Sequence, residues 1–335
     1  MLSRVADSIY WMARYVERAE NLARFVEVAM NFSLDQPDSG VEQWEPLIRA
    51  TGDDDEFLEA CSDFSEANVR QFLTFDGDYH SSILTSVTNA RENARTVREA
   101  ISSEAWEQLN ALYHFVRTAA GAGSAMSVDA TFYDAVVQYC YHFTGILDAT
   151  MTRGTGWNFA NIGRHLERAD KTSRILDVKY FTLLRHVSDV DTPIDDLLWS
   201  TVLRSACGFE MYRKRFHSVT VERIADFLIL EDEFPRAIRY CIRQVQNSLL
   251  TIAAPVEPEV NSAILQTNEM LDDLNGLSPR AIIQRGMHEA IDSLQSRMNQ
   301  VALAIHDTYF AHRTFPGPQM QSLMQSQTQL QSAGR

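Results

Sequence analysis

The sequence predicts an all-α protein. Its 335 residues include only nine prolines and fourteen glycines, and no segment shows the strict apolar–polar alternation of a half-buried strand. Near the N-terminus, apolar residues instead recur every three or four positions, which is the spacing of one helix face. A block of residues then returns 150 positions later. We therefore expect a helical bundle built from two pseudo-repeated halves, each with one long helix that carries a Glu-Arg motif.

The first predicted helix runs from about residue 2 to about residue 34. Its apolar seam consists of Leu2, Val5, Ile9, Met12, Val16, Ala19, Ala23, Val26 and Met30. A second stripe is polar and follows the same three-and-four spacing, so its members share another side of the helix. It consists of Tyr10, Arg14, Glu17, Asn21 and Arg24.

The same stripe returns in a second long helix, expected from about Trp157 to about Val187. With the offset of 150, the matched pairs are Arg14 and Arg164, Glu17 and Glu167, Arg18 and Arg168, Ala19 and Ala169, Glu20 and Asp170, Arg24 and Arg174, and Glu27 and Asp177. A solvated face explains Glu20, Glu27 and their repeats about as well as a buried role, because exposed i,i+4 pairs are common on helices. Surface pairs contribute little to stability. The repeated Glu-Arg dipeptides therefore favour buried pairs, which fix specificity or hold a charged ligand.

Between these helices the sequence predicts short helices over residues 41–80 and longer ones over 81–102, 103–118 and 127–151. The acidic run at residues 53–56 follows Thr51-Gly52 and is typical of a helix N-terminus, not of a metal site. Arg91, Arg95 and Arg98 share one face of the helix over 81–102. Since three like charges repel one another, we expect that face to be buried against acids or to bind a ligand.

Gly154-Thr155-Gly156 marks the boundary between the halves, which we place at residues 1–153 and 154–315. In the second half, Thr192-Pro193 begins one helix and Phe234-Pro235-Arg236 opens another. That second helix carries Arg239 and Arg243 at the spacing of Arg91 and Arg95. A last helix is predicted from Pro279 to about Arg313, with a near-heptad seam that packs within this chain or on another copy. The Gln- and Ser-rich residues 316–335 are expected to be disordered.

Composition excludes several classes of function. A net charge of −15 argues against a general binder of nucleic acid or anionic membranes. No run of about 18 apolar residues or signal-peptide core occurs, so we expect a cytoplasmic protein without a membrane span. The four cysteines lack metal-ligand spacing and are expected to be buried thiols. None of the nine histidines follows a glutamate by three residues, and HExxH, Walker A and Rossmann patterns are missing. We therefore expect neither a metal nor a cofactor.

Several segments together resemble the bacterial Alpha-E family, described as a predicted α-helical domain with an "ER" motif. They are Tyr10–Arg24, Ala90–Arg95, Asn161–Asp177 and Phe234–Tyr240, and the resemblance extends over nearly all of residues 1–315. Members of the family resemble accessory subunits found beside circularly permuted ATP-grasp ligases and transglutaminase-like proteins. The resemblance therefore implies a part in forming peptide or amide bonds, with such a ligase or transglutaminase-like protein as partner.

Three functions remain open at this point. The first is an accessory subunit that does not itself bind ATP and that holds an anionic small molecule or peptide. Its ligand-binding residues would be Arg14, Arg18, Arg91, Arg95, Arg164, Arg168 and Arg239, oriented by Glu17 and Glu167. The second is an enzyme in which Glu17 or Glu167 is the acid or base. The third is a scaffold whose charged stripes pair internally. A ligand site would leave arginines partly unpaired around a pocket, whereas a scaffold would match each one with an acceptor.

Overall fold

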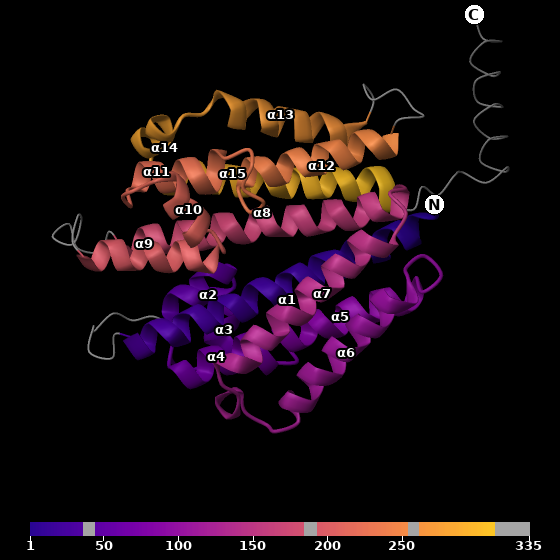
Figure 1. Ribbon diagram of the computed structural model, residues 1–335, viewed down its shortest axis with the longest axis horizontal. Helices are drawn as coiled ribbons and strands as arrows, with labels where there is room; N and C mark the ends of the chain where they lie inside the picture. Colours follow the sequence, from indigo (N-terminus) through magenta and orange to yellow (C-terminus); the bar gives the residue numbers. More distant parts are fainter. Residues whose placement is uncertain (36–43, 184–192, 254–260, 312–335) are drawn as a thin grey trace, which may run out of the picture.

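The computed structural model describes residues 1–35, 44–183, 193–253 and 261–311. Within these ranges the chain forms fifteen α-helices and no strand, which confirms the all-α class (Figure 1). The buried apolar residues form one cluster that draws on the helices before and after residue 154.

The N-terminal helix α1 spans Ser3–Asp35. Most of its predicted seam is buried, including Ile9, Met12, Ala19 and Val26. The prediction that Leu2 belongs to the seam is wrong, because Leu2 precedes the helix and is 65% exposed. The seam is therefore a core face that begins one turn later than the sequence suggested.

Six further α-helices precede residue 154 among the described residues. These are α2 (Glu45–Thr51), α3 (Asp54–Ala60), α4 (Glu66–Phe75), α5 (Ile83–Thr96), α6 (Ser103–Ala120) and α7 (Ala130–Thr150), with the 3₁₀ turn η1 (Ala125–Ser127). Helices α1, α5, α6 and α7 form a closed circuit in which each packs on the next. The acidic run is confirmed as a helix start, since Asp54, Asp55 and Glu56 form the first turn of α3. Helix α5 is shorter than predicted because the backbone leaves helical geometry at Val97.

Eight α-helices follow residue 154 in the part of the chain that the structure describes, and the first of them is the second long helix. They are α8 (Thr155–Leu183), α9 (Pro193–Ser205), α10 (Phe209–Arg215), α11 (Val221–Ala225), α12 (Ile238–Ala253), α13 (Ser262–Gly276), α14 (Pro279–Arg285) and α15 (Met287–Ile305), with π-helical turns η3 (Asp226–Leu230) and η5 (His306–Phe310). Helix α8 packs on α12, α12 on α13, α13 on α15 and α15 on α8.

The single long helix predicted from Pro279 to about Arg313 is wrong. Gly286 ends α14 and precedes α15 with a φ of +101°, a conformation that an α-helix does not contain. Beyond that break, Met287, Ile291, Leu294 and Met298 are buried as the seam predicts. The expected disordered tail, residues 316–335, lies outside the described residues.

Helices α1 and α8 lie side by side and run in the same direction (Figure 1). They approach closely at Gly163, where an added Cβ would stand 2.3 Å from the backbone oxygen of Tyr10. Glycine therefore lets the two backbones approach closely. The approach brings residues near position 17 of α1 against residues near position 167 of α8. Among the described residues, no helix is both long and apolar enough to cross a membrane.

Candidate functional site

The two Glu-Arg dipeptides meet where α1 and α8 touch. We call Arg14, Glu17, Arg18, Arg164, Glu167 and Arg168 the ER cluster. Glu167 has no solvent exposure and pairs with two arginines of α1, Arg14 and Arg18. Arg18 donates from Nε to Oε1 at 2.7 Å and from Nη2 to Oε2 at 3.1 Å, while Arg14 donates from Nε to Oε2 at 2.8 Å. Two guanidinium groups thus neutralise one buried carboxylate.

The pairing is reciprocal. Arg168 of α8 donates from Nε to Oε1 of Glu17 at 2.7 Å and from Nη2 to Oε2 at 2.8 Å. Arg18 does the same to Glu167, so each motif arginine reaches across to the glutamate of the other helix. Bidentate Arg–carboxylate pairs are among the stronger hydrogen-bonded contacts in proteins. The repeated dipeptide is therefore used to join the two helices.

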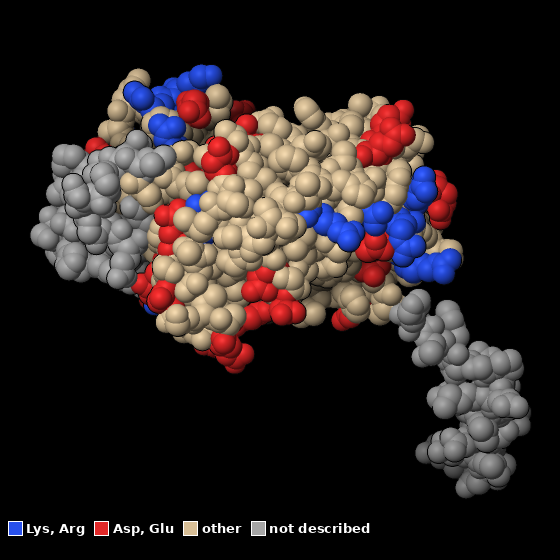
Figure 2. Space-filling model, turned by 90° about the horizontal axis from the view of Figure 1, so that it is seen from below, with Lys and Arg blue, Asp and Glu red and all other residues tan. Residues whose placement is uncertain are grey.

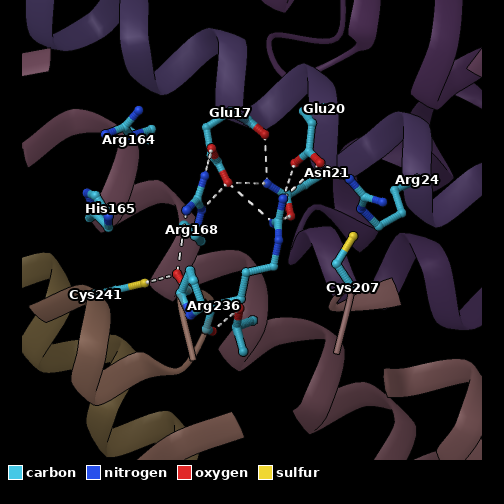
Figure 3. Close-up of polar contacts among 12 residues, drawn as sticks. Glu17, Glu20, Asn21, Arg24, Arg164, His165, Arg168, Cys207, Arg236 and Cys241 are labelled. Atoms are coloured by element: carbon cyan, nitrogen blue, oxygen red, sulfur yellow. Dashed lines mark hydrogen bonds and ion pairs between the residues drawn. The ribbon is translucent and has the colours of Figure 1, made fainter. Parts of the chain in front are cut away.

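Arg236, in the turn that leads into α12, extends this network (Figure 3). Its Nη1 donates to Glu17 at 3.4 Å and to Asn21 at 3.1 Å, and its Nη2 contacts both carboxylate oxygens of Glu20 at 2.8 and 2.9 Å. Arg24 also pairs with Glu20. Sequence reasoning placed Arg236 in a characteristic segment without giving it a role. Phe234-Pro235-Arg236 was expected to open a helix, but α12 begins at Ile238, so Arg236 lies in the preceding turn and helix geometry could not predict its contacts.

The interpretation of Glu20 as part of a solvated face is wrong. Glu20 is 2% exposed and is neutralised by Arg24 and Arg236. Its counterpart Asp170 is mostly buried as well and pairs with Lys171 and Arg174. The polar stripe of each long helix is thus an interior surface.

The network sets the charge state of its acids. Burial raises the pKa of Glu17, but Arg168 and Arg236 outweigh it and hold that pKa at about 2, below the ordinary 4.5. Glu167 behaves alike: burial opposes ionisation, while Arg18 and Arg14 keep its pKa well below the usual range. Burial and the nearby arginines lower the pKa of His165 to about 3. At neutral pH both glutamates are ionised and His165 is neutral.

Arg164 breaks the reciprocity. Its counterpart Arg14 bonds to a glutamate, whereas Arg164 donates to Asn161 at 2.8 Å and to Asp148 at 3.5 Å. Its Nε–H is buried and has no acceptor. A cavity of about 10 Å³, lined by Arg164, Glu17 and Trp157 among others, lies beside it. That volume is about the room of one water molecule.

The other predicted ligand-binding arginines have different partners. Arg91 donates to Asn110 of α6 at 2.8 Å and lies over the Tyr113 ring, 4.6 Å from its centroid. Arg95 is 60% exposed and pairs with Glu92. Arg239 of α12 lies 3.0 Å from Asp232. The structure therefore brings Arg14, Arg18, Arg164 and Arg168 together and gives Arg91, Arg95 and Arg239 contacts outside the ER cluster.

The cysteines divide into two kinds. Cys140 and Cys241 are buried as predicted, but Cys61 and Cys207 are only partly buried, which corrects the expectation for that pair. All four are free thiols. In the described part of the chain, no three His, Cys, Asp or Glu residues are placed to hold a metal ion.

Comparison with known proteins gives a family and distant relatives. Uncharacterised proteins of Mycobacterium bovis and Mycobacterium tuberculosis are each 22% identical to this chain over 322 residues. The match covers 90% of this chain and 35% of each relative, so the chain spans about a third of their length. No solved structure matches it. A family model for a predicted alpha-helical domain with a conserved ER motif matches residues 1–310, and the chain therefore belongs to the Alpha-E family.

Proposed function

We propose that this chain is a non-catalytic partner subunit of a peptide- or amide-forming system of the ATP-grasp type. The observation that carries the proposal is the state of Glu17 and Glu167, the two candidate acids or bases. Each is buried, ionised and held by arginines of the opposite helix. A general acid or base works best with a pKa near the operating pH, so these carboxylates are suited to pairing and not to proton transfer.

The length of the relatives supports a partner role. In the mycobacterial proteins the matched region is 35% of the chain, so this domain occurs there joined to a larger remainder. Figure 2 shows a broad face whose middle carries few charged side chains, although the whole chain has a net charge of −15. A face depleted of charge at its centre is typical of protein interfaces.

We also propose that residues 1–153 and 154–315 are equivalent halves. The circuit of α1, α5, α6 and α7 corresponds to that of α8, α12, α13 and α15. The reciprocal pairs Arg18–Glu167 and Arg168–Glu17 support the same view, because equivalent surfaces that face each other produce each contact twice. The ER cluster is then the joint between the halves.

The anionic ligand expected from the sequence is proposed at one place, beside Arg164. Cations outnumber acids along the α1–α8 contact. The cations are Arg14, Arg18, Arg24, Arg164, Arg168, Lys171, Arg174 and Arg236, and the acids are Glu17, Glu20, Asp148, Glu167 and Asp170. Two of these cations, Arg24 and Arg164, have a buried Nε–H without an acceptor, and of the two Arg164 lines the cavity described above. One oxygen atom of an anionic group would supply that acceptor by entering the cavity beside Arg164, which has the room of a single water molecule.

Thermal denaturation with added inorganic phosphate tests the Arg164 site. We expect phosphate to raise the melting temperature of the native chain and to have a smaller effect on Arg164→Met. The matched control is Arg153→Met, because Arg153 also contacts Asp148 but has a 54% exposed side chain. Equal phosphate shifts in the native chain and both variants would contradict a site at Arg164.

Affinity purification from native cells tests the partner role. The tagged full-length chain is isolated and analysed by mass spectrometry, with Glu17→Gln as a parallel variant. We expect an ATP-dependent ligase in a fixed ratio to the native chain, and no turnover by the chain alone. If the native chain is purified without a partner and converts a substrate that the Glu17→Gln variant does not convert, the enzyme alternative is correct.

A further inference from the structure

Cys207 lies in the turn between α9 and α10 and has an unusual backbone. Its φ is +52°, and among the described residues it is the only one other than glycine with a positive value. The turn ends α9 with hydrogen bonds from Cys207 N to Arg204 O at 2.9 Å and from Gly208 N to Leu203 O at 2.7 Å. Glycine is the usual residue in that left-handed position. The turn therefore holds a cysteine side chain at a left-handed position where helix ends usually have glycine.

The thiol is surrounded by polar groups from other helices. Its Sγ is 3.4 Å from the Tyr141 hydroxyl of α7, which in turn accepts a hydrogen bond from Nη2 of Arg24 at 2.8 Å. Figure 3 shows the sulfur pointing toward Arg24. Burial lowers the pKa of Arg236, while Glu17 and Cys207 raise it. The Tyr141 hydroxyl thus joins the partly exposed thiol to the Arg24 guanidinium.

One donor of this group has no acceptor. Arg24 is 9% exposed, and its Nε–H is buried without a hydrogen-bond partner. A buried donor without an acceptor is unfavourable, because it has lost its water and gained nothing in return. An oxygen atom added to the neighbouring sulfur would place an acceptor next to that donor. The same oxygen would lie within reach of the Tyr141 hydroxyl.

We propose that Cys207 is an oxidation site, at which a hydroperoxide converts the thiol to a sulfenic acid that Arg24 and Tyr141 stabilise. The sulfur attacks one peroxide oxygen, the O–O bond breaks, and an S–O bond forms. The sulfur loses two electrons and the peroxide gains them. The other oxygen leaves as water or an alcohol and takes up the proton that the thiol gives up. The sulfenic acid is the reversible first step of cysteine oxidation.

The other thiols lack this setting. Cys61 is also partly buried, but burial and the carboxylates of Asp76 and Asp63 raise its pKa. Cys241 is buried, and burial raises its pKa to about 12. Burial also raises the pKa of Cys140 far above its ordinary value. Because the thiolate is the reactive form, these three sites should react slowly, and Cys61 serves as an internal control of similar exposure.

The test is site-resolved labelling of the native full-length chain. The chain is treated with hydrogen peroxide in the presence of dimedone, which traps sulfenic acids, and each cysteine peptide is quantified by mass spectrometry over time. We expect Cys207 to be labelled about tenfold faster than Cys61. In guanidinium chloride the rates should become similar, because unfolding removes the difference in environment.

Two variants identify the groups responsible. Tyr141→Phe keeps the ring and removes the hydroxyl, and Arg24→Met removes the donor while Arg236 remains on Glu20. We expect both to slow labelling of Cys207 severalfold and to leave Cys61 unchanged. Tyr139→Phe on the same helix is the matched control and should change neither rate. If Arg24→Met does not fold, the labelling rate of Cys207 in Tyr141→Phe alone tests the proposal. Equal labelling of Cys207 and Cys61 in the native chain, or an unchanged rate in Tyr141→Phe, would overturn the proposal.

Discussion

At the scale of single residues, Glu167 is a buried carboxylate held by two arginines of another helix. It has no solvent exposure and neutralises Arg14 and Arg18 together. Glu167→Gln keeps the shape and removes the charge, which leaves two guanidinium groups buried without a counter-ion. We expect the free energy of unfolding to fall by about 3–5 kcal/mol.

Denaturant titration measures that loss, and Glu92→Gln is its matched control. Glu92 also contacts two arginines, Arg91 and Arg95, but its side chain is 45% exposed. The same substitution there should cost less than about 1 kcal/mol, because water screens the pair. Similar losses in the two variants would show that the ER cluster contributes no more than a surface network.

The shifted pKa values predict a loss of stability in two steps on acidification. The unfolded chain protonates His165 near pH 6.5, but burial keeps its folded pKa near 3, so stability falls as the pH drops from about 6.5 toward 3. Glu17 has an ordinary pKa of 4.5 and a folded pKa of about 2. Its contribution is complete above about pH 4.5 and is lost as the pH falls toward 2.

Unfolding free energies measured across the pH range test this order. His165→Asn should flatten the dependence between about pH 6.5 and pH 3 and leave the part below pH 3 unchanged. Glu17→Gln should flatten the part below about pH 4.5, on top of a lower overall stability. A His165→Asn profile parallel to that of the native chain would show that His165 is not the group responsible.

The sequence predicted much of the site at this scale. Equal spacing in two helices placed Glu17, Glu167 and their arginines correctly on matching faces, since side-chain direction follows from helix geometry. It did not show which residues of the two helices pair or that Arg236 joins them, because those contacts depend on tertiary packing. Arg91 was assigned from charge repulsion, yet stacking on Tyr113 and a bond to Asn110 hold it.

At the scale of elements, the contact between α1 and α8 depends on Gly163. An added Cβ there would meet the Tyr10 backbone oxygen at 2.3 Å, and backbone cannot move aside as a flexible side chain can. Gly163→Ala should therefore separate the helices and lower the free energy of unfolding by about 1–3 kcal/mol.

Gly145→Ala in α7 is the matched control for that prediction. No atom lies within 4 Å of a Cβ added at Gly145, and alanine is favoured over glycine within a helix by roughly 0.5–1 kcal/mol. We expect this variant to be as stable as the native chain or more so, by the same denaturant titration. Two variants with effects of equal sign would refute the close-approach argument.

Periodicity predicted the long helices better than their breaks. The seam of α15 was correct, but its apparent continuation to Pro279 ignored Gly286, whose positive φ separates two helices that share one apolar pattern. Helix α13 was not predicted at all. A repeating apolar pattern indicates which face of a helix is buried. The pattern continues across a break when the helices on both sides pack on the same core.

At the scale of the whole molecule, the ER cluster makes the two proposed halves dependent on each other. Residues 1–153 alone would carry Arg14 and Arg18 without Glu167, and residues 154–315 alone would carry Arg168 without Glu17. We expect neither fragment to show a cooperative thermal transition, and an equimolar mixture to recover one. Circular dichroism with size-exclusion chromatography measures both, and a cooperative transition in either fragment alone would contradict the expectation.

The parallel course of α1 and α8 has a consequence for the electric field of the molecule. Each long helix carries a macrodipole equivalent to roughly half a positive charge at its start and half a negative charge at its end. Antiparallel neighbours cancel such fields, whereas these two add, and their aligned dipoles repel. The cross-linked ion pairs at mid-length offset that repulsion. The starts of α1 and α8 therefore carry like partial positive charges, and the ends of their antiparallel neighbours α5 and α12 lie beside these starts and offset them.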